Sequence, residues 1–179
     1  MTGMADKRIR MTKRMLAEQL IEAASVRDFD DISISEICEK AGVSRVTFYK
    51  YYRNLKDLMD ETAASALQQI HPETADRENT EEIIRRILHN RALYKVLIEK
   101  GYCEEAFSTY LKNTVRNSSA GNPDEEILQL QAQYAACGLC GMIHDCLKED
   151  CDITPKKLSG MVLRFYESWK NDVYALNNL

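Results

Sequence analysis

The chain has 179 residues, of which 45% are hydrophobic and 29% are charged. This composition is typical of a globular protein with room for two small domains, and it excludes a disordered tail. No apolar run approaches the ~20 residues that span a bilayer, and no signal-peptide core follows the basic N-terminus, so we expect a cytoplasmic protein with no membrane partner. The six cysteines, at irregular spacing, are expected to be reduced thiols.

The formal net charge of −4 is unevenly distributed. Residues 1–56 carry eleven Lys and Arg against eight Asp and Glu, whereas residues 57–179 carry thirteen against twenty. Five cations lie before residue 15, namely Lys7, Arg8, Arg10, Lys13 and Arg14. The pattern leaves two interpretations open: these side chains contact nucleic-acid phosphates, or they belong to a solvated, partly disordered terminus.

Helical periodicity begins close to the N-terminus. Apolar residues recur at three- and four-residue spacing over residues 12–26, which predicts a support helix there. Residues 32–52 have the pattern of two short helices joined by a tight turn. Ser33 is expected to cap the first of them, with Glu36 completing a capping box, and Ser44 is expected to cap the second.

The second of these short helices differs between its two sides. At about 100° per residue, Phe48 and Tyr52 share one face. The rest of the helix offers methyl groups, hydroxyls and cations that suit a DNA groove, and these belong to Arg45, Val46, Thr47, Tyr49 and Lys50. Gly42 supplies the backbone freedom that the turn needs. The pair is therefore predicted to be a helix-turn-helix whose second helix enters a major groove.

This pattern resembles the N-terminal signature of the tetracycline-repressor (TetR) family. The residues that carry the resemblance are 33–38, 41–44, 47–52 and 57–58, within about residues 10–60. The resemblance implies an all-α homodimeric transcription factor that binds a double-stranded DNA operator and a small effector. The family usually has a lysine where this chain has Leu55, so Lys56 or Arg53 is expected to contact that phosphate. The predicted DNA-contact residues are Ser33, Ser35, Ser44, Arg45, Val46, Thr47, Tyr49, Lys50, Tyr51 and Lys56.

The remaining pattern is also helical, without strand-like alternation or repeats. Asn54 is expected to cap a helix from Leu55 to Ile70, and a polar loop should follow over residues 72–79. Later helices are predicted over 80–101 with a break near His89 and Asn90, then over 103–115, 123–148 and 154–173, with a loop at 121–123. The expected fold is all-α, with an N-terminal three-helix helix-turn-helix domain (8–54) and a C-terminal helical effector-binding and dimerisation domain (55–179).

The last two predicted helices carry more apolar surface than one protomer's core needs, and the first of them contains several small residues. Two such helices from each protomer would form a four-helix bundle and hold the recognition helices ~34 Å apart. Packing within one chain is the alternative. The predicted interface residues are Ala135, Gly138, Gly141, Leu158, Val162, Phe165 and Trp169.

Two further groups of residues in the C-terminal part could bind a ligand. Cys137 and Cys140 form a CxxC motif, for which apolar packing is preferred over a thiol sensor or a metal site. Aromatic and polar groups on the inner helix faces, each of a kind that more often fills a core than contacts a ligand, form the predicted effector pocket: His89, Tyr94, Leu97, Phe107, Tyr110, Leu111, Tyr134, Met142 and Phe165.

The sequence has no Ser-His-Asp grouping, glycine-rich phosphate loop or paired catalytic carboxylates, so neither an enzyme nor a cofactor is expected. The predicted function is a ligand-responsive DNA-binding regulator, specifically a repressor that an effector releases from its operator. The rival interpretation is a TetR-like protein that has lost operator binding and contacts another protein, as Leu55 suggests.

Overall fold

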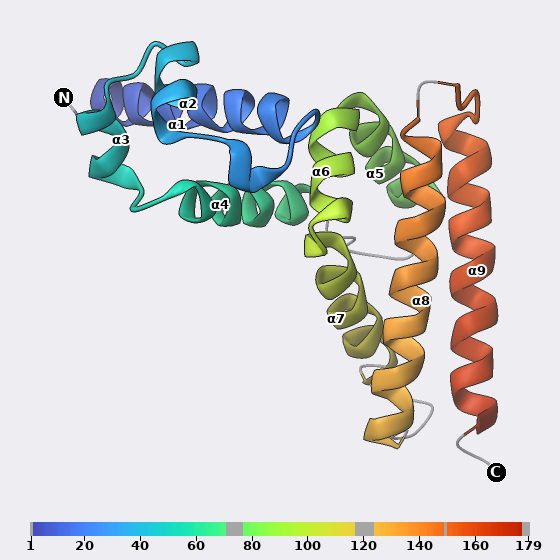
Figure 1. Ribbon diagram of the computed structural model, residues 1–179. Coiled ribbons are helices and arrows are strands. Elements are labelled where there is room, and N and C mark those ends of the chain that lie inside the picture. The colour runs from blue at the N-terminus through green and yellow to red at the C-terminus, as the bar shows by residue number, and fades with distance from the viewer. Residues whose placement is uncertain (1, 71–76, 117–123, 149, 177–179) are drawn as a thin grey trace. The chain divides into compact units, whose positions relative to one another are not determined.

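The structure, a computed structural model, describes residues 2–70, 77–116, 124–148 and 150–176. Within these ranges it has nine α-helices, one short 3-10 helix and no strand, which confirms the all-α class (Figure 1). The chain divides into two compact units, Met1–Ala66 and Leu67–Leu179. The boundary between the two units lies near the end of helix α4. The domain boundary predicted from the sequence, Leu55, is the first residue of the same helix.

The N-terminal unit contains α1 (Thr2–Ala24), the 3-10 helix η1 (Phe29–Asp31), α2 (Ile34–Lys40), α3 (Arg45–Tyr51) and most of α4 (Leu55–Gln69). Its core is built from large apolar side chains that are fully buried: Leu16, Leu20, Ile37, Phe48 and Leu58. Helix α1 begins ten residues earlier than the predicted start at residue 12. The five N-terminal cations therefore lie on this helix.

The caps of the two short helices are largely as predicted. The Ser33 hydroxyl accepts a hydrogen bond from the Glu36 N–H at 3.2 Å, and the Ser44 hydroxyl accepts one from the Thr47 N–H at 3.1 Å. Gly42 has φ +65°, the left-handed conformation that glycine adopts without a steric penalty. The reciprocal half of the capping box is wrong, because the Glu36 carboxylate pairs with Arg27 at 2.5 Å instead.

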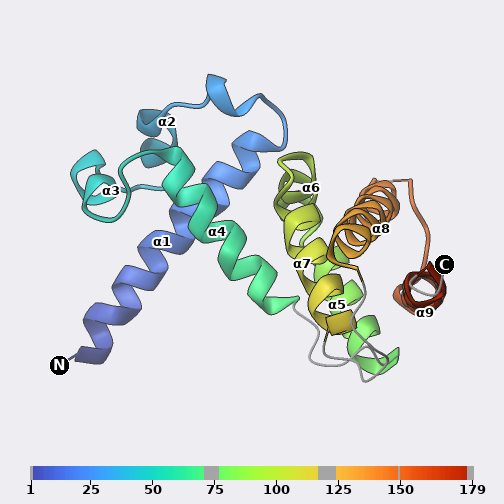
Figure 2. The ribbon, with the colours of Figure 1, turned by 90° about the horizontal axis from the view of Figure 1, so that it is seen from below.

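The C-terminal unit contains α5 (Arg77–His89), α6 (Arg91–Glu99), α7 (Tyr102–Arg116), α8 (Glu125–Cys146) and α9 (Pro155–Leu176). Helix α7 packs along α8, and α5 packs against α9 (Figure 2). One apolar cluster joins α7, α8 and α9, and the Trp169 indole N–H donates to the Gln131 carbonyl at 3.0 Å. The buried members of this cluster are Leu111, Val115, Leu128, Ala132, Ala135, Ala136, Leu139, Trp169 and Val173.

Most predicted helix ends of this unit match the structure. Asn90 separates α5 from α6, and Gly101, with φ +79°, follows the end of α6. The predicted loop over 72–79 is wrong at its end, because α5 begins at Arg77 with an acidic residue in its first turn. Asp124 is the N-cap of α8 rather than a first-turn residue, and its carboxylate accepts from the Glu126 and Ile127 N–H groups. The predicted loop at 121–123 lies outside the described residues.

Candidate nucleic-acid interface and ligand cavity

Helix α3 has one buried and one exposed face. Phe48 and Tyr52, which follows the helix, are 0% and 4% exposed, whereas Val46 and Tyr49 are 82% and 51% exposed. Arg45 and Lys50 are exposed as well, so the sides match the helical prediction. The two hydroxyls at the start of the helix, on Ser44 and Thr47, are 2.8 Å apart and hydrogen-bonded. A rigid, capped helix thus presents branched apolar, aromatic and cationic side chains to solvent.

Leu55, the first residue of α4, is buried, only 7% exposed. Its aliphatic side chain therefore cannot replace the phosphate contact of a lysine. The two candidates for that contact already form ion pairs, Arg53 with Asp57 at 2.9 Å and Lys56 with Asp60 at 2.6 Å. The hydrogen bond from Arg53 lowers the pKa of the Asp57 carboxyl. A phosphate would compete with the carboxylate for either cation. Breaking a solvent-exposed ion pair of this kind costs little free energy.

A polar network ties α1, α3 and α4 together behind the exposed face. Lys13 donates to the Glu61 carboxylate at 2.8 Å, and its ammonium lies 5.3 Å from the centre of the Tyr52 ring. The Tyr52 hydroxyl donates to Glu61 at 3.2 Å. Burial, and then the charge of Glu61, raise the pKa of Tyr52 above its ordinary value. The network links the middle of α4 to α1 and to the end of α3, because Lys13 and Tyr52 both donate to Glu61.

We expect Tyr52→Phe to lower the free energy of unfolding by about 0.5–1.5 kcal/mol, since it removes one hydrogen bond from a buried site and leaves the ring in place. The raised pKa adds a pH signature. The contribution of Tyr52 is complete below its unfolded pKa of about 10 and is lost as the pH rises above that value. Urea unfolding at pH 8 and pH 11 measures both effects, and the difference between variant and wild type should shrink at pH 11. The exposed Tyr49→Phe is the control, and equal losses in the two variants would contradict the network.

The N-terminal half of α1 carries a group of cations in the same unit. Lys7, Arg8, Arg10 and Arg14 line a shallow recess together with Met11. Two of the cations are partly neutralised within the helix, Arg14 by Glu18 at 2.7 Å and Arg10 by Asp6 at 3.7 Å. Lys7 and Arg8 add their charges to these two pairs, so the recess is basic overall. It therefore adds to the electrostatic attraction that a polyanion would meet at this unit.

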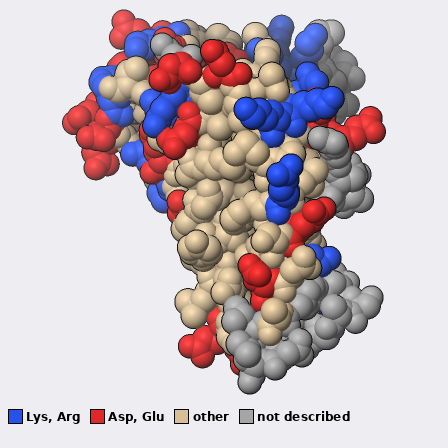
Figure 3. Space-filling view, turned by 90° about the vertical axis from the view of Figure 1, so that its right-hand side faces the viewer, with Lys and Arg blue, Asp and Glu red and all other residues tan. Residues whose placement is uncertain are grey.

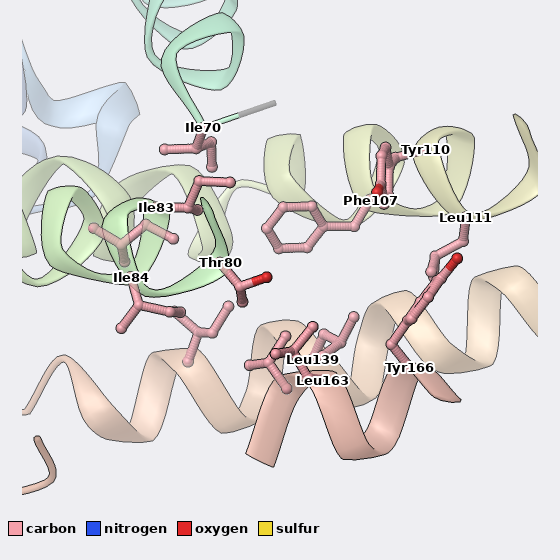
Figure 4. A pocket seen from close by; sticks show the side chains of 13 residues that line it. Ile70, Thr80, Ile83, Ile84, Phe107, Tyr110, Leu111, Leu139, Leu163 and Tyr166 are labelled. Atoms are coloured by element: carbon pink, nitrogen blue, oxygen red, sulfur yellow. The ribbon is translucent and has the colours of Figure 1, made fainter. Parts of the chain in front are cut away.

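The C-terminal unit contains a partly open cavity of about 100 Å³ between α5, α7, α8 and α9 (Figure 4). Its walls are almost entirely aliphatic and aromatic. They consist of Ile70, Thr80, Ile83, Ile84, Ile87, Phe107, Tyr110, Leu111, Leu139, Ile143, Val162, Leu163 and Tyr166. Of the nine residues predicted to contact an effector, the structure brings Phe107, Tyr110 and Leu111 to this cavity.

The other six predicted effector residues lie elsewhere. His89 and Tyr134 are exposed, and Tyr94 and Leu97 are buried away from the cavity lining. Met142 and Phe165 pack against the apolar cluster of α7, α8 and α9. The sequence analysis predicted a helix over this segment but did not include its isoleucines, Ile83, Ile84 and Ile87, among the pocket residues. A stripe predicts which side is buried, but it does not tell whether the opposing side chains meet or leave a space.

The geometry of the N-terminal unit agrees with a comparison of sequences. Residues 13–62 match the family model described as bacterial regulatory proteins, tetR family. The N-terminal unit is a tetR-family DNA-binding domain. The match confirms the resemblance drawn from the helix-turn-helix residues. A comparison with curated proteins finds no match.

Solved structures extend the likeness beyond the matched domain. A TetR transcriptional regulator from Streptococcus agalactiae 2603V has a TM-score of 0.65 at 18% identity, covering 91% of this chain and 97% of that one. A protein assigned to the TetR family from Syntrophomonas wolfei str. Goettingen has a TM-score of 0.60 at 14% identity, covering 90% and 96%. The dihydroxyacetone kinase operon activator DhaS has a TM-score of 0.52 at 16% identity, covering 93% and 96%. Both units of the chain therefore have the fold of TetR regulators.

The C-terminal unit of this TetR fold exposes an apolar stripe on α8. Leu130 and Tyr134 are 66% and 75% exposed, and Cys137, Gly138 and Gly141 continue the stripe at helical spacing. Seen from the side of α9, an uncharged strip runs down this unit between charged margins (Figure 3). Three of the predicted interface residues, Ala135, Leu158 and Trp169, lie instead inside the protomer core. Val162 and Phe165 are half-buried, so the exposed stripe differs from the predicted set.

The two cysteines of the CxxC motif have different surroundings. Cys140 is 1% exposed, and burial strongly raises the pKa of its thiol, which keeps it protonated. Cys137 is exposed on the outer stripe, so the prediction that both thiols are packed within the helix bundle is wrong for Cys137 in the protomer. Among the described residues, no three His, Cys, Asp or Glu side chains are grouped as a metal site would need.

We expect the Cys137→Ala/Cys140→Ala double variant to fold and to lose at most about 2 kcal/mol of unfolding free energy, nearly all of it from the trimmed core at Cys140. Thermal unfolding of the double variant and of each single variant checks this division. DNA binding in the presence of peroxide or Zn²⁺ is the second readout. If either reagent releases wild-type protein from DNA and leaves the double variant bound, the thiols are sensors.

Proposed function

We propose that the chain is a dimeric DNA-binding transcription regulator, a repressor whose operator affinity changes when a small molecule occupies the C-terminal cavity. The observation that carries this proposal is the exposed face of α3 within a tetR-family DNA-binding domain. Val46 and Tyr49 are the most exposed large apolar residues of the helix, and Arg45 and Lys50 flank them. Such a face has no role in folding the protomer and matches the chemistry of base edges and phosphates.

The exposed stripe of α8 supports a homodimer. Two exposed large apolar side chains, Leu130 and Tyr134, favour a contact surface because burial removes their area from water, and the small residues that continue the stripe allow a close helix contact. Pairing α8 and α9 of two protomers would give a four-helix bundle and two α3 helices suited to successive turns of one DNA face. A dimer also predicts a palindromic operator.

The end of α4 supports a route from cavity to DNA-binding domain. The Gln69 carbonyl, at the end of α4, accepts a hydrogen bond from the Arg86 guanidinium of α5 at 2.9 Å. The next residue, Ile70, lines the cavity. Midway along the same helix lies Glu61, which accepts from Lys13 and Tyr52. A molecule that binds more tightly to one position of Ile70 than to another would shift the population of α4 orientations.

Binding to duplex DNA tests the proposal. We would select sequences from a random duplex pool with the intact protein and measure their binding by fluorescence anisotropy between 50 and 200 mM salt. The expected result is a palindromic site whose affinity falls steeply with salt. If no duplex is enriched over the pool, the rival interpretation of a protein-interaction partner gains support from the buried Leu55 and the paired Arg53 and Lys56.

The proposed function also has consequences for the location of the protein, for catalysis and for the sign of regulation. Among the described residues, no helix is long and apolar enough to cross a membrane. We infer a cytoplasmic location, where DNA is accessible, and no catalytic role. The structural neighbour that is an operon activator shares the fold. Transcription measured with and without the protein therefore decides between repression, which we propose, and activation.

A further inference from the structure

The chemistry of the cavity walls restricts the kind of molecule that fits. None of its thirteen lining residues is Lys, Arg, His, Asp or Glu. A charged group entering such a site would lose its hydration without gaining an ion pair, and only the hydroxyls of Thr80, Tyr110 and Tyr166 among the lining side chains could bond to it. A molecule with many hydroxyls would meet the same obstacle on a smaller scale. The walls therefore disfavour carboxylates, phosphates, amines and sugars.

The size of the cavity sets a second limit. Its volume is about 100 Å³. An apolar cavity of ~150 Å³ lined by Leu, Ile and Phe in another protein stays dry and takes up benzene. The present cavity is lined mainly by these residue types, with Thr80, Tyr110, Val162 and Tyr166 in addition, and it is somewhat smaller. It accordingly suits one six-membered ring with slight outward movement of the walls, and it is too small for a fused-ring compound.

The arrangement of the walls favours a flat aromatic guest. Phe107 projects from α7 into the space, and Leu139 and Leu163 close it from the opposite side (Figure 4). Aromatic pairs add edge or offset contacts to the burial of apolar area. Thr80 brings a hydroxyl into this apolar lining, directed toward the space between Phe107 and Leu163 (Figure 4). A hydroxyl has one donor and two acceptor sites, so it can bond to a guest in addition to a partner in the protein.

We propose that the cavity binds an uncharged, single-ring aromatic molecule, with Thr80 selecting guests that carry one hydroxyl. This inference rests on the proposed function for its regulatory meaning, because the guest would be the effector. The binding itself is independent of DNA. The ring would lie against Phe107, and a phenolic hydroxyl would lie near Thr80, in its neutral form.

Isothermal titration calorimetry with the intact protein tests the chemical class. The probes are toluene, phenol and benzoate, which share a ring and differ in polarity and charge. We expect toluene and phenol to bind and benzoate to bind at least 100-fold more weakly than toluene. Benzoate binding as tightly as toluene would overturn the class. Failure of both neutral probes to bind would overturn the site.

Variants test the location and the role of Thr80. Thr80→Val, which keeps the shape and removes the hydroxyl, should weaken phenol several-fold and leave toluene unchanged. Thr109→Val, at an exposed position of α7, is the matched control. Ile83→Ala enlarges the cavity and should admit naphthalene, which the wild type excludes. Leu163→Phe should fill it and abolish toluene binding. Toluene binding that is unchanged in both Ile83→Ala and Leu163→Phe would place the guest elsewhere.

The outcomes for DNA separate this inference from the proposed function. If toluene binds the cavity but leaves operator affinity unchanged, the proposed chemical class of the guest is supported and the proposed coupling between cavity and DNA binding is contradicted. If a charged molecule changes operator affinity while no neutral aromatic molecule binds, regulation by an effector is supported and the proposed chemical class is contradicted.

Discussion

Gly141→Leu is expected to convert the protein to a monomer and to weaken operator binding by at least a hundredfold. Gly141 lies on the outer stripe of α8, and a Cβ added there would meet no protomer atom within 4 Å apart from its chain neighbours and the nearby backbone of its own helix. The new side chain thus fits the protomer, and replacing glycine within a helix should if anything stabilise it. Only a partner helix packed closely against this position would be displaced. A monomer contacts only one half-site of the operator. In a dimer the second half-site contact raises the affinity about 10²–10⁴-fold through avidity.

Sedimentation velocity and operator titration measure the two effects on the same samples. Gly138→Leu is a second test, since its added Cβ would lie 3.8 Å from the Phe165 ring, an ordinary contact distance. Ala92→Leu, at an exposed position of α6, controls for a bulky apolar side chain on the surface. Should Gly141→Leu remain a dimer with normal operator affinity, the proposed interface would have to be moved off this stripe of α8.

Substitutions on α3 should separate phosphate contacts from base readout. We expect Lys50→Ala to weaken binding to every operator variant alike and to lower the log–log salt slope by about one unit per subunit contact, because one phosphate loses its cation. We expect Arg45→Ala to cost about 1–3 kcal/mol, and to do so chiefly at one base pair of each half-site. Both side chains are exposed, so neither substitution should alter folding.

Anisotropy titrations over a panel of single-base operator variants, each at four salt concentrations, provide both readouts. Lys100→Ala, an exposed lysine of the C-terminal unit, controls for the change in net charge. An unchanged slope with altered base preference would assign Lys50 to base readout. Uniform weakening by Arg45→Ala across the panel would assign that residue to the backbone. Thr47, whose hydroxyl already bonds to Ser44, should add less to base discrimination than Arg45.

The local features of the DNA-binding domain were readable from the sequence because they depend on near neighbours. Ser33 and Ser44 cap their helices through backbone groups three residues away, and Gly42 permits a left-handed turn. The burial of Phe48 and Tyr52 follows from the helical repeat alone. Glu36 shows the limit of such reasoning. Its predicted partner was three residues away, but Arg27, nine residues away, reaches it once the chain folds.

The C-terminal unit depended more heavily on contacts between distant residues. Helical periodicity predicted its helices and identified apolar stripes, yet it could not rank the positions within a stripe. Cys137 and Cys140 are three residues apart, and only packing against neighbouring helices left the first exposed and buried the second. Ala135, Leu158 and Trp169 were expected at a partner surface and lie instead in the protomer core.

The sequence by itself determined the helical class, the helix-turn-helix and the identity of its exposed face, because these follow from hydrogen bonds and side-chain directions repeated every few residues. Only the tertiary structure decided which apolar residues surround a cavity. Six of the nine predicted effector residues lie away from it, and Thr80 with the isoleucines of α5 lines it instead. A cavity arises where side chains of four helices fail to fill the space between them, and the volume left over is a property of their packing together and of no single helix.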